Sequence, residues 1–140
     1  MDKIWAIEQA IVEQLKSSEI GARIDNDPRN GQASPKALVL VQHEGDMPTG
    51  GQPRNCHALN LTFTVEVRAT DQRIGSHKNV YPVIEAVRQC LIAFDVGNGS
   101  NLAYGGTERQ DFPTETGIYW RYMMRFSCHT VWSQEAKTNG

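Results

Sequence analysis

The chain has 140 residues, of which 39% are hydrophobic and 21% are charged, and its formal net charge is −2. This composition is typical of a globular protein, and the length predicts one domain over residues 1–140. The slightly acidic balance argues against nucleic acid as the main partner. No apolar run approaches the roughly 20 residues that cross a bilayer, so we expect no membrane contact.

The N-terminal segment lacks the basic and apolar regions of a signal peptide. We therefore expect the three cysteines, Cys56, Cys90 and Cys128, to be reduced thiols in a cytosolic protein, with Cys90 and Cys128 in the core.

An amphipathic helix is predicted from a cap at Asp2 to about Ser18, with Gly21 closing its C-terminal end. A short strand is predicted over residues 22–25, followed by a polar turn. Residues 37–41, Ala-Leu-Val-Leu-Val, are apolar on both faces and predict a buried strand.

Residues 45–55 contain two prolines and three glycines. This composition predicts a loop without regular structure. Its length exceeds that of a common hairpin loop, which is typical of a functional or disordered segment.

The clearest periodic pattern lies between Leu59 and Ala69. Odd positions are apolar and even positions are polar throughout this run. Because successive side chains on a strand point to opposite faces, the run predicts a central antiparallel strand with one dry face and one solvated face.

The second half of the chain predicts a helix over about residues 79–94, with Pro82 in its first turn. A strand over residues 102–112 follows, with a bulge at Gly105 and Gly106. A turn at residues 113–117 leads to a long final strand, and residues 133–140 are expected to be a frayed tail. Together the elements predict an α+β fold with a single, mostly antiparallel sheet of about four to five strands and two helices packed on one face.

The sequence contains no recognisable catalytic or metal-binding motif. The pairs Cys56–His57 and Cys128–His129 lack the spacing of a zinc site, and adjacent strand residues point to opposite faces, so no metal site is expected. We find no nucleophile motif or phosphate-binding loop, and expect no cofactor and no enzymatic activity. An alternative is a small α+β enzyme or ligand-binding domain that uses acidic residues at Glu108, Asp111 and Glu115, with His57 or His129 in a pocket.

The final strand carries the pattern that favours an interaction surface. One of its faces mixes Tyr119 and Met123 with Arg121 and Arg125. Arginine and aromatic residues are enriched at protein interfaces. A light cover of these side chains by the loop at 45–55 would explain the same pattern without a partner. The candidate contact residues on this face and in the loop are Met47, Thr49, Gln52, Arg54, Tyr119, Arg121, Met123 and Arg125.

The order of these segments resembles a known family. It comprises the helix with Ile-Glu-Gln-Ala-Ile-Val-Glu-Gln-Leu-Lys, the strand after Pro35, the strand over 59–69, the helix from Tyr81 and the final Ile-Tyr-Trp-Arg-Tyr-Met-Met-Arg-Phe. This succession is similar to the small tail proteins of Mu-like phages and prophages. It resembles, more loosely, the tail terminator proteins of long-tailed phages.

The resemblance implies a non-enzymatic structural protein of a virion tail, assembled in the cytoplasm of a host bacterium. It implies a homo-oligomeric ring, typically a hexamer, that caps the tail tube, ends its polymerisation and joins it to the head. The implied partners are further copies of the chain, the tail tube protein and a head-completion or connector protein. Another connector in the head–tail neck would share most of these features.

Overall fold

The computed structural model describes residues 3–26, 37–49, 56–97, 100–115 and 117–133. Five strands form one sheet in the order β1-β2-β3-β5-β4. The short β1 is parallel to β2, and the other neighbours are antiparallel. The strands are β1 (Arg23–Asp25), β2 (Leu38–Pro48), β3 (Cys56–Thr70), β4 (Ala103–Thr114) and β5 (Gly117–Ser133). The expected α+β fold is confirmed, and the parallel β1 makes the sheet mixed.

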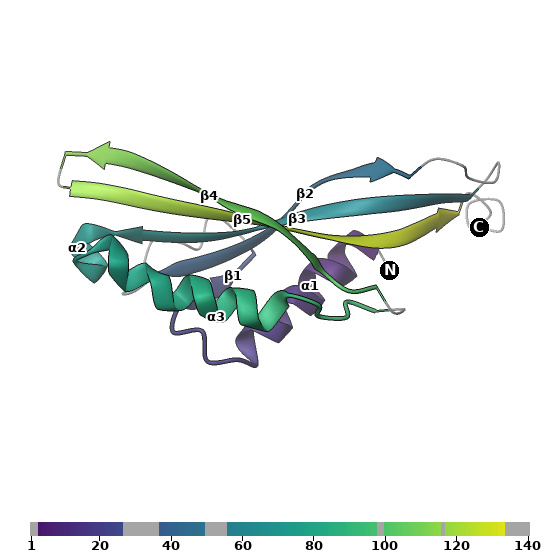
Figure 1. Cartoon of the computed structure of the whole chain (residues 1–140), viewed down its shortest axis with the longest axis horizontal. Helices are drawn as coiled ribbons and strands as arrows, with labels where there is room; N and C mark the ends of the chain where they lie inside the picture. The colour runs from purple at the N-terminus through teal and green to yellow at the C-terminus, as the bar shows by residue number, and fades with distance from the viewer. Residues whose placement is uncertain (1–2, 27–36, 50–55, 98–99, 116, 134–140) are drawn as a thin grey trace.

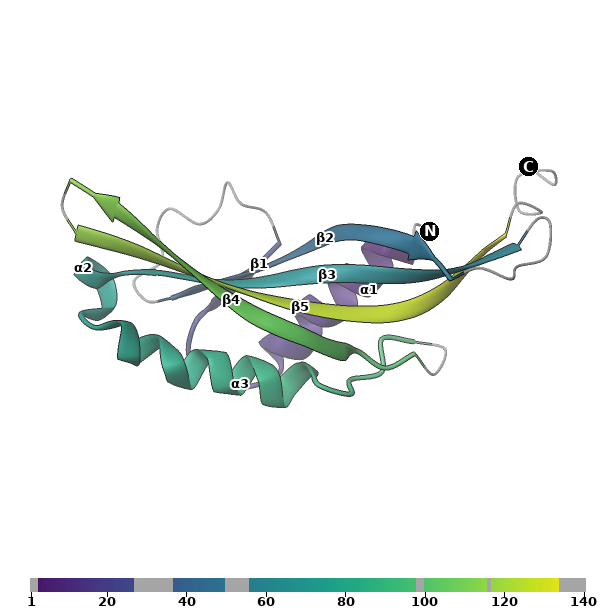
Figure 2. The ribbon, with the colours of Figure 1, turned by 45° about the horizontal axis from the view of Figure 1, so that its top comes forward.

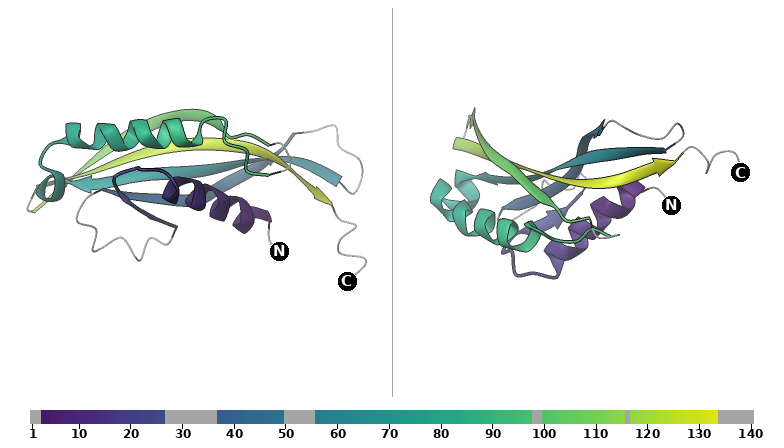
Figure 3. Two further views of the ribbon diagram at one scale, coloured as in Figure 1. Left: turned by 90° about the horizontal axis from the view of Figure 1, so that it is seen from below. Right: turned by 45° about the vertical axis from the view of Figure 1, so that its right-hand side comes forward.

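The helices are α1 (Lys3–Lys16), the single turn α2 (Asp71–Ile74), the 3-10 helix η2 (His77–Val80) and α3 (Tyr81–Leu91). Figure 1 shows a long, twisted sheet with α1 and α3 on the same side of it. Figure 3 shows the two helices next to each other under the sheet, and Gln14 of α1 and Cys90 of α3 exchange hydrogen bonds of 3.4 Å. None of the described helices is long and apolar enough to cross a membrane.

The core fills the space between this helix layer and the sheet. The odd residues of β3 and the even residues of β5 point into it, as the period-2 patterns predict. Side chains that are fully buried there come from both layers: Ile11, Leu15, Val39, Val41, Phe63, Val65, Val67, Val87, Leu91, Met124 and Phe126. Cys128 is buried in the same core, and burial raises the pKa of its thiol; Cys90 is partly buried at the helix–helix contact.

Several expected boundaries are wrong. Strand β2 continues through Pro48, so residues 45–48 are not loop. A register shift between His43 and Gly45 leaves Glu44 without a partner residue in the ladder. A proline is tolerated at position 48 because β1 covers only the start of β2, which leaves this part at the edge of the sheet. Residues 50–55 of the expected loop lie outside the described residues.

The ends of the helices also differ from the expectation. Helix α1 ends at Lys16, and Gly21, with a φ of 78°, lies beyond Ile20, so it does not cap the helix. The segment between β3 and α3 forms the single turn α2 and the 3-10 helix η2. Ser133, expected in the frayed tail, is the last residue of β5, and the rest of that segment lies outside the described residues.

Candidate interaction face of the sheet

The sheet has a second face, which none of the described helices covers and which we call the outer face (Figure 2). The strand register determines which side chains point there: even residues of β3 and odd residues of β5. The expected solvated face of the Leu59–Ala69 strand lies here. Its centre is not solvated, however, because Thr64 and Glu66 are 8% and 5% exposed. The interpretation of this face as wet along its whole length is therefore wrong.

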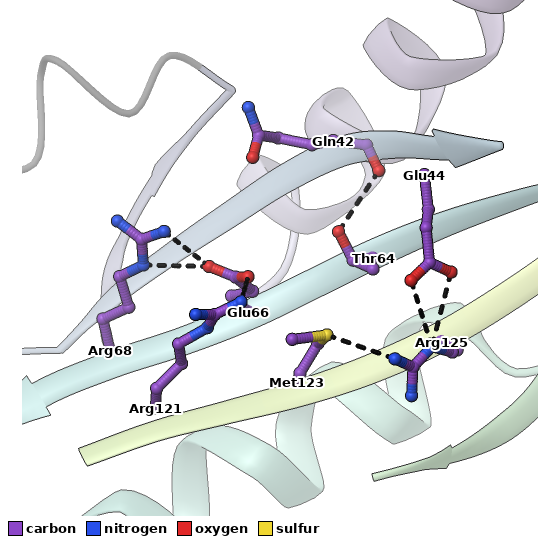
Figure 4. A network of polar contacts seen from close by, with 8 residues as sticks. All are labelled: Gln42, Glu44, Thr64, Glu66, Arg68, Arg121, Met123 and Arg125. Atoms are coloured by element: carbon purple, nitrogen blue, oxygen red, sulfur yellow. Dashed lines mark hydrogen bonds and ion pairs between the residues drawn. The ribbon is translucent and has the colours of Figure 1, made fainter. Parts of the chain in front are cut away.

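The buried centre of the outer face contains a carboxylate, that of Glu66, whose two oxygens are both paired. Glu66 accepts hydrogen bonds of 2.9 and 2.7 Å from Nε and Nη2 of Arg68, two residues along β3. Its other oxygen pairs with Nη2 of Arg121 on β5 at 2.8 Å. A carboxylate can be buried when both of its oxygens have charged donors, as here. We call these three residues the Glu66 cluster (Figure 4).

A second ionic group lies farther along β5. Nε of Arg125 donates to the carboxylate of Glu44 on β2, at 3.2 and 3.3 Å. Nη1 of Arg125 pairs with Glu108 on β4 at 3.5 Å, and Nη2 lies 3.6 Å from the sulfur of Met123. These residues form the Arg125 cluster, which links β2, β5 and β4 across the outer face. Figure 4 shows Glu44, Met123 and Arg125 of this cluster beside the Glu66 cluster, with Met123 on the side nearer Arg121.

The two clusters have opposite formal charges. The Glu66 cluster contains two arginines and one glutamate, which gives +1, and the Arg125 cluster contains two glutamates and one arginine, which gives −1. The guanidinium side chains of Arg121 and Arg125 are 29% and 34% exposed, so both groups can meet a partner. The middle of the outer face therefore carries one patch of each sign.

Exposed apolar side chains lie toward both ends of this face. At the β4–β5 hairpin, the rings of Phe112 and Tyr119 are 5.7 Å apart, and Phe112 is 41% exposed. Burial raises the pKa of Tyr119, while the nearby Arg68 acts in the opposite direction. At the other end, Met47 is 68% exposed and Val131 is 48% exposed. The outer face is thus a charged centre between two apolar ends.

The predicted contact residues fall into two separate groups. Tyr119, Arg121, Met123 and Arg125 form one row on the outer face. Met47 and Thr49 belong to the opposite end, because Met47 pairs with Asn60 whereas Tyr119 pairs with Thr70. Met47 lies about 33 Å along the strands from Tyr119 at roughly 3.3 Å per residue, and about 13 Å from Arg125, which pairs with Thr64.

The other two predicted contact residues, Gln52 and Arg54, lie outside the described residues. Glu44 and Glu66 were missed by the sequence interpretation, although they pair with the predicted arginines. Only the register, which places β3 between β2 and β5, identifies them as partners.

The edges of the sheet are less suited to pairing with another chain. Within the described part, β4 has a strand neighbour on one side only. Strand β2 also has a neighbour on one side only from Gln42 onward, because β1 pairs with it no farther than Leu40. Both edges contain a register shift, at His43/Gly45 and at Tyr104/Thr107, where Gly106 has a φ of 108°. Bulges and charged side chains on edge strands prevent sheet extension. The face is therefore the better interaction surface.

The residues of the enzyme alternative do not converge. Glu108 points to the outer face, whereas Asp111 pairs with Trp120 and points to the helix side. Glu115 lies in the exposed hairpin turn. His129 lines a cavity of about 560 Å³, as expected, but none of the three carboxylates lines it. The side chain of His57 lies outside the described residues. No three His, Cys, Asp or Glu side chains among the described residues are grouped so that they could hold a metal ion.

Comparison with known proteins gives a similarity of fold. No protein-family model and no curated protein matches the sequence. Among solved structures, the chain is similar to a protein chain in the virion of a native gene transfer agent (GTA) particle, with a TM-score of 0.62 and 12% sequence identity. The similarity covers 94% of this chain and 100% of that chain. The chain therefore has, over nearly its whole length, the fold of a component of that particle.

Proposed function

We propose that this chain is a non-enzymatic structural protein of a phage-type tail, which forms a ring that caps the tail tube, ends its polymerisation and joins it to the head. The observation that supports this most is the similarity of fold, over 94% of the chain, to a chain of a gene transfer agent virion. The order of sequence segments, which resembles tail terminators, supports the same role.

The outer face supports self-association. Arginine, methionine and aromatic side chains are enriched in protein interfaces, and here they occur at alternate positions of β5. The carboxylates that pair with Arg121 and Arg125 belong to the same chain, so both guanidinium groups are held in place before a partner arrives. Pre-ordered side chains lose less conformational entropy on binding.

The separation of the two apolar ends favours a head-to-tail contact. A ring closes when one surface of each subunit meets a different surface of the next and the rotation between them closes. In our proposal the Phe112–Tyr119 end of one copy meets the end of the next that carries Met47 and Val131. Six copies are expected from the resemblance, and the tail tube protein and a head-completion or connector protein would contact the ring.

The first experiment is the mass of the purified chain at micromolar concentration, measured by analytical ultracentrifugation and light scattering. A closed oligomer, with rings visible by electron microscopy, is the expected result. Phe112→Lys should dissociate it, because it places a charge in the Phe112–Tyr119 contact end, whereas Gln89→Lys, which adds the same charge on an exposed position of α3, should not. A monomer at all concentrations, both alone and with tail tube protein, would contradict the proposal.

Mixing two variants tests the head-to-tail arrangement. Met47→Glu and Phe112→Glu should each give monomers, because each removes one of the two contact ends. An equimolar mixture still contains one intact pair of ends, so it should give dimers and no rings. Rings in the mixture, or dimers from either variant alone, would exclude this contact.

Tail tube polymerisation separates a terminator from another connector of the neck. In a polymerisation assay with purified tail tube protein, substoichiometric amounts of this chain should stop growth and leave a ring at one end of each tube. Unchanged tube lengths, together with a stable ring, would assign the chain to another part of the neck.

A further inference from the structure

A second polar site lies on the opposite side of the sheet, between α3 and the edge strand β4. A cavity of about 300 Å³ opens there. It is distinct from the outer face, because the residues of β4 and β5 that line it point toward the helices. Its lining residues are Tyr81, Ile84, Glu85, Arg88, Thr107, Arg109 and Tyr122.

The hydroxyl of Tyr122 is the unusual group in this cavity. Tyr122 is 6% exposed, and its hydroxyl is buried without a hydrogen-bond partner among the described residues. Nε of Arg88 is likewise buried without a partner there. Most buried polar groups in proteins have a partner. Tyr122 and Arg88 both line the cavity, so two donors without a partner among the described residues belong to its walls.

Two guanidinium groups line the same cavity. Arg88 lies over the ring of Tyr104 at 5.5 Å and Arg109 lies over the ring of Tyr122 at 5.7 Å. Nη2 of Arg88 also lies 3.4 Å from the hydroxyl of Thr107, which ties α3 to β4. Aromatic and polar neighbours thus hold the Arg88 guanidinium on two sides, whereas the side chain of Arg109 is 39% exposed.

The carboxylates of the chain itself are held elsewhere. Glu85 accepts from Nη1 of Arg88 at 2.9 Å, and Asp111 accepts from Nε and Nη2 of Arg109 at 2.8 and 3.1 Å. Both leave the Tyr122 hydroxyl and Nε of Arg88 unused. Burial raises the pKa of Tyr122, so its hydroxyl remains a donor at neutral pH.

We infer that this cavity binds a carboxylate, with one oxygen accepting from the Tyr122 hydroxyl and the other from Nε of Arg88, and with the Arg109 guanidinium beside it. A carboxylate fits better than a neutral carbonyl, because hydrogen bonds from guanidinium groups to ionised acceptors are the stronger ones. The small volume accepts one acidic side chain or a free small carboxylate. Neither source depends on the ring proposal.

NMR titration of the full chain tests this site. The resonances are those of the Nε–H of Arg88 and the labelled ring of Tyr122, and the probes are acetate, the peptide acetyl-Gly-Glu-Gly-amide and its Gln counterpart. Saturable shifts with the Glu peptide are expected, and the Gln peptide should bind about tenfold more weakly. Stronger binding of the Glu peptide than of acetate would assign the site to an acidic side chain of another protein, and the reverse order to a free carboxylate.

Tyr122→Phe is the decisive variant, because it removes only the hydroxyl. It should weaken binding of the Glu peptide about tenfold, as the loss of a hydrogen bond to a charged group does. Its melting temperature should stay the same, since the hydroxyl has no partner in the fold to lose. Gln110→Ala, beside Arg109 but pointing to the outer face, is the control and should bind normally.

Three results would overturn the assignment. Absence of saturable shifts with both carboxylate probes would mean that only water fills the cavity. Equal binding of the Glu and Gln peptides would mean that the site does not select a carboxylate. A lower melting temperature for Tyr122→Phe, without a change in binding, would give the hydroxyl a purely structural role.

Discussion

The two faces of strands β3 and β5 are built from the same stretch of chain and differ in almost every physical respect. The helix-side face is largely apolar, and its centre, with Phe63, Val65 and Met124, is completely buried under the helices. The outer face, with Glu66, Arg121 and Arg125, is held by ion pairs between strands. Because side chains alternate along each strand, one face of the sheet stabilises the fold and the other is available to a partner.

The comparison also shows that burial on the two faces has different causes. Phe63 is buried because the helices displace water from it, which stabilises the fold in proportion to apolar area. Glu66 is buried beside two arginines that satisfy its oxygens. A buried ion pair of this kind contributes little net stability, but removing one of its charges leaves the other unpaired and destabilises the fold. Substitutions on the two faces should therefore separate into distinct classes.

The largest effect is expected for Phe63→Ala on the helix side. The ring is fully buried in the centre of β3, so truncation leaves a cavity, and the free energy of unfolding should fall by about 3–5 kcal/mol. Chemical denaturation measures it. Thr62→Ala, the neighbour on the outer face, is the control and should change the free energy by about 1 kcal/mol or less. Similar losses for both variants would invalidate the distinction between the faces.

Two adjacent methionines on β5 allow the two faces of the sheet to be compared with the same residue type. Met124 is fully buried and Met123 is half-buried on the outer face. Met124→Ala should lower the free energy of unfolding by about 2–5 kcal/mol, and Met123→Ala by about 1 kcal/mol or less. Denaturation at several protein concentrations detects a further effect of Met123→Ala on self-association. Equal effects at the lowest concentration would show that the outer face is as firmly packed as the core.

An intermediate loss is expected for Glu66→Gln. The amide cannot compensate the two guanidinium groups, which remain close together in a buried setting. Because Arg68 and Arg121 keep some solvent contact, the loss should be about 1–3 kcal/mol, below that of a fully buried broken pair. Thermal denaturation at low and high salt measures it, and the variant should gain from added salt, which screens the repulsion. A variant as stable as the parent would show that the cluster has no structural role.

The smallest effect concerns Tyr119 at alkaline pH. Burial raises its pKa in the folded state, whereas an unfolded tyrosine ionises at about pH 10. The unfolded chain therefore loses its proton first, so the contribution to stability is complete below about pH 10 and decreases as the pH rises through the folded pKa. Tyr119→Phe should make the alkaline decline shallower in denaturation curves between neutral and alkaline pH. An unchanged decline would assign it entirely to other groups, such as Tyr122.

The periodic segments were predictable because burial follows local sequence there. The alternation over Leu59–Ala69 and over Ile118–Cys128 correctly gave the facing of β3 and β5. The bulge at Gly105 and Gly106 was also expected and is confirmed by the register shift between Tyr104 and Thr107. In each case residue type and spacing alone determine which side chains can face a core.

The candidate contact residues were predictable only in part. The row on β5 from Tyr119 to Arg125 follows from composition, but the extension of β2 through Pro48 does not, because an edge strand tolerates glycine and proline that a central strand would not. The cavity with Tyr122 and Arg88 was not predicted. Its residues are separated in sequence, and no local pattern marks a tyrosine hydroxyl that lacks a partner.

The sequence by itself determined that this chain forms amphipathic strands and helices with one shared apolar face, since periodicity and hydrophobicity are local properties. Only the tertiary structure decided which charges meet. Glu44, Arg125 and Glu108 come from three different strands, and Glu66 meets Arg121 across a strand boundary. Register fixes these pairs, and register depends on how the whole sheet packs against its helices, so no single segment of sequence contains it.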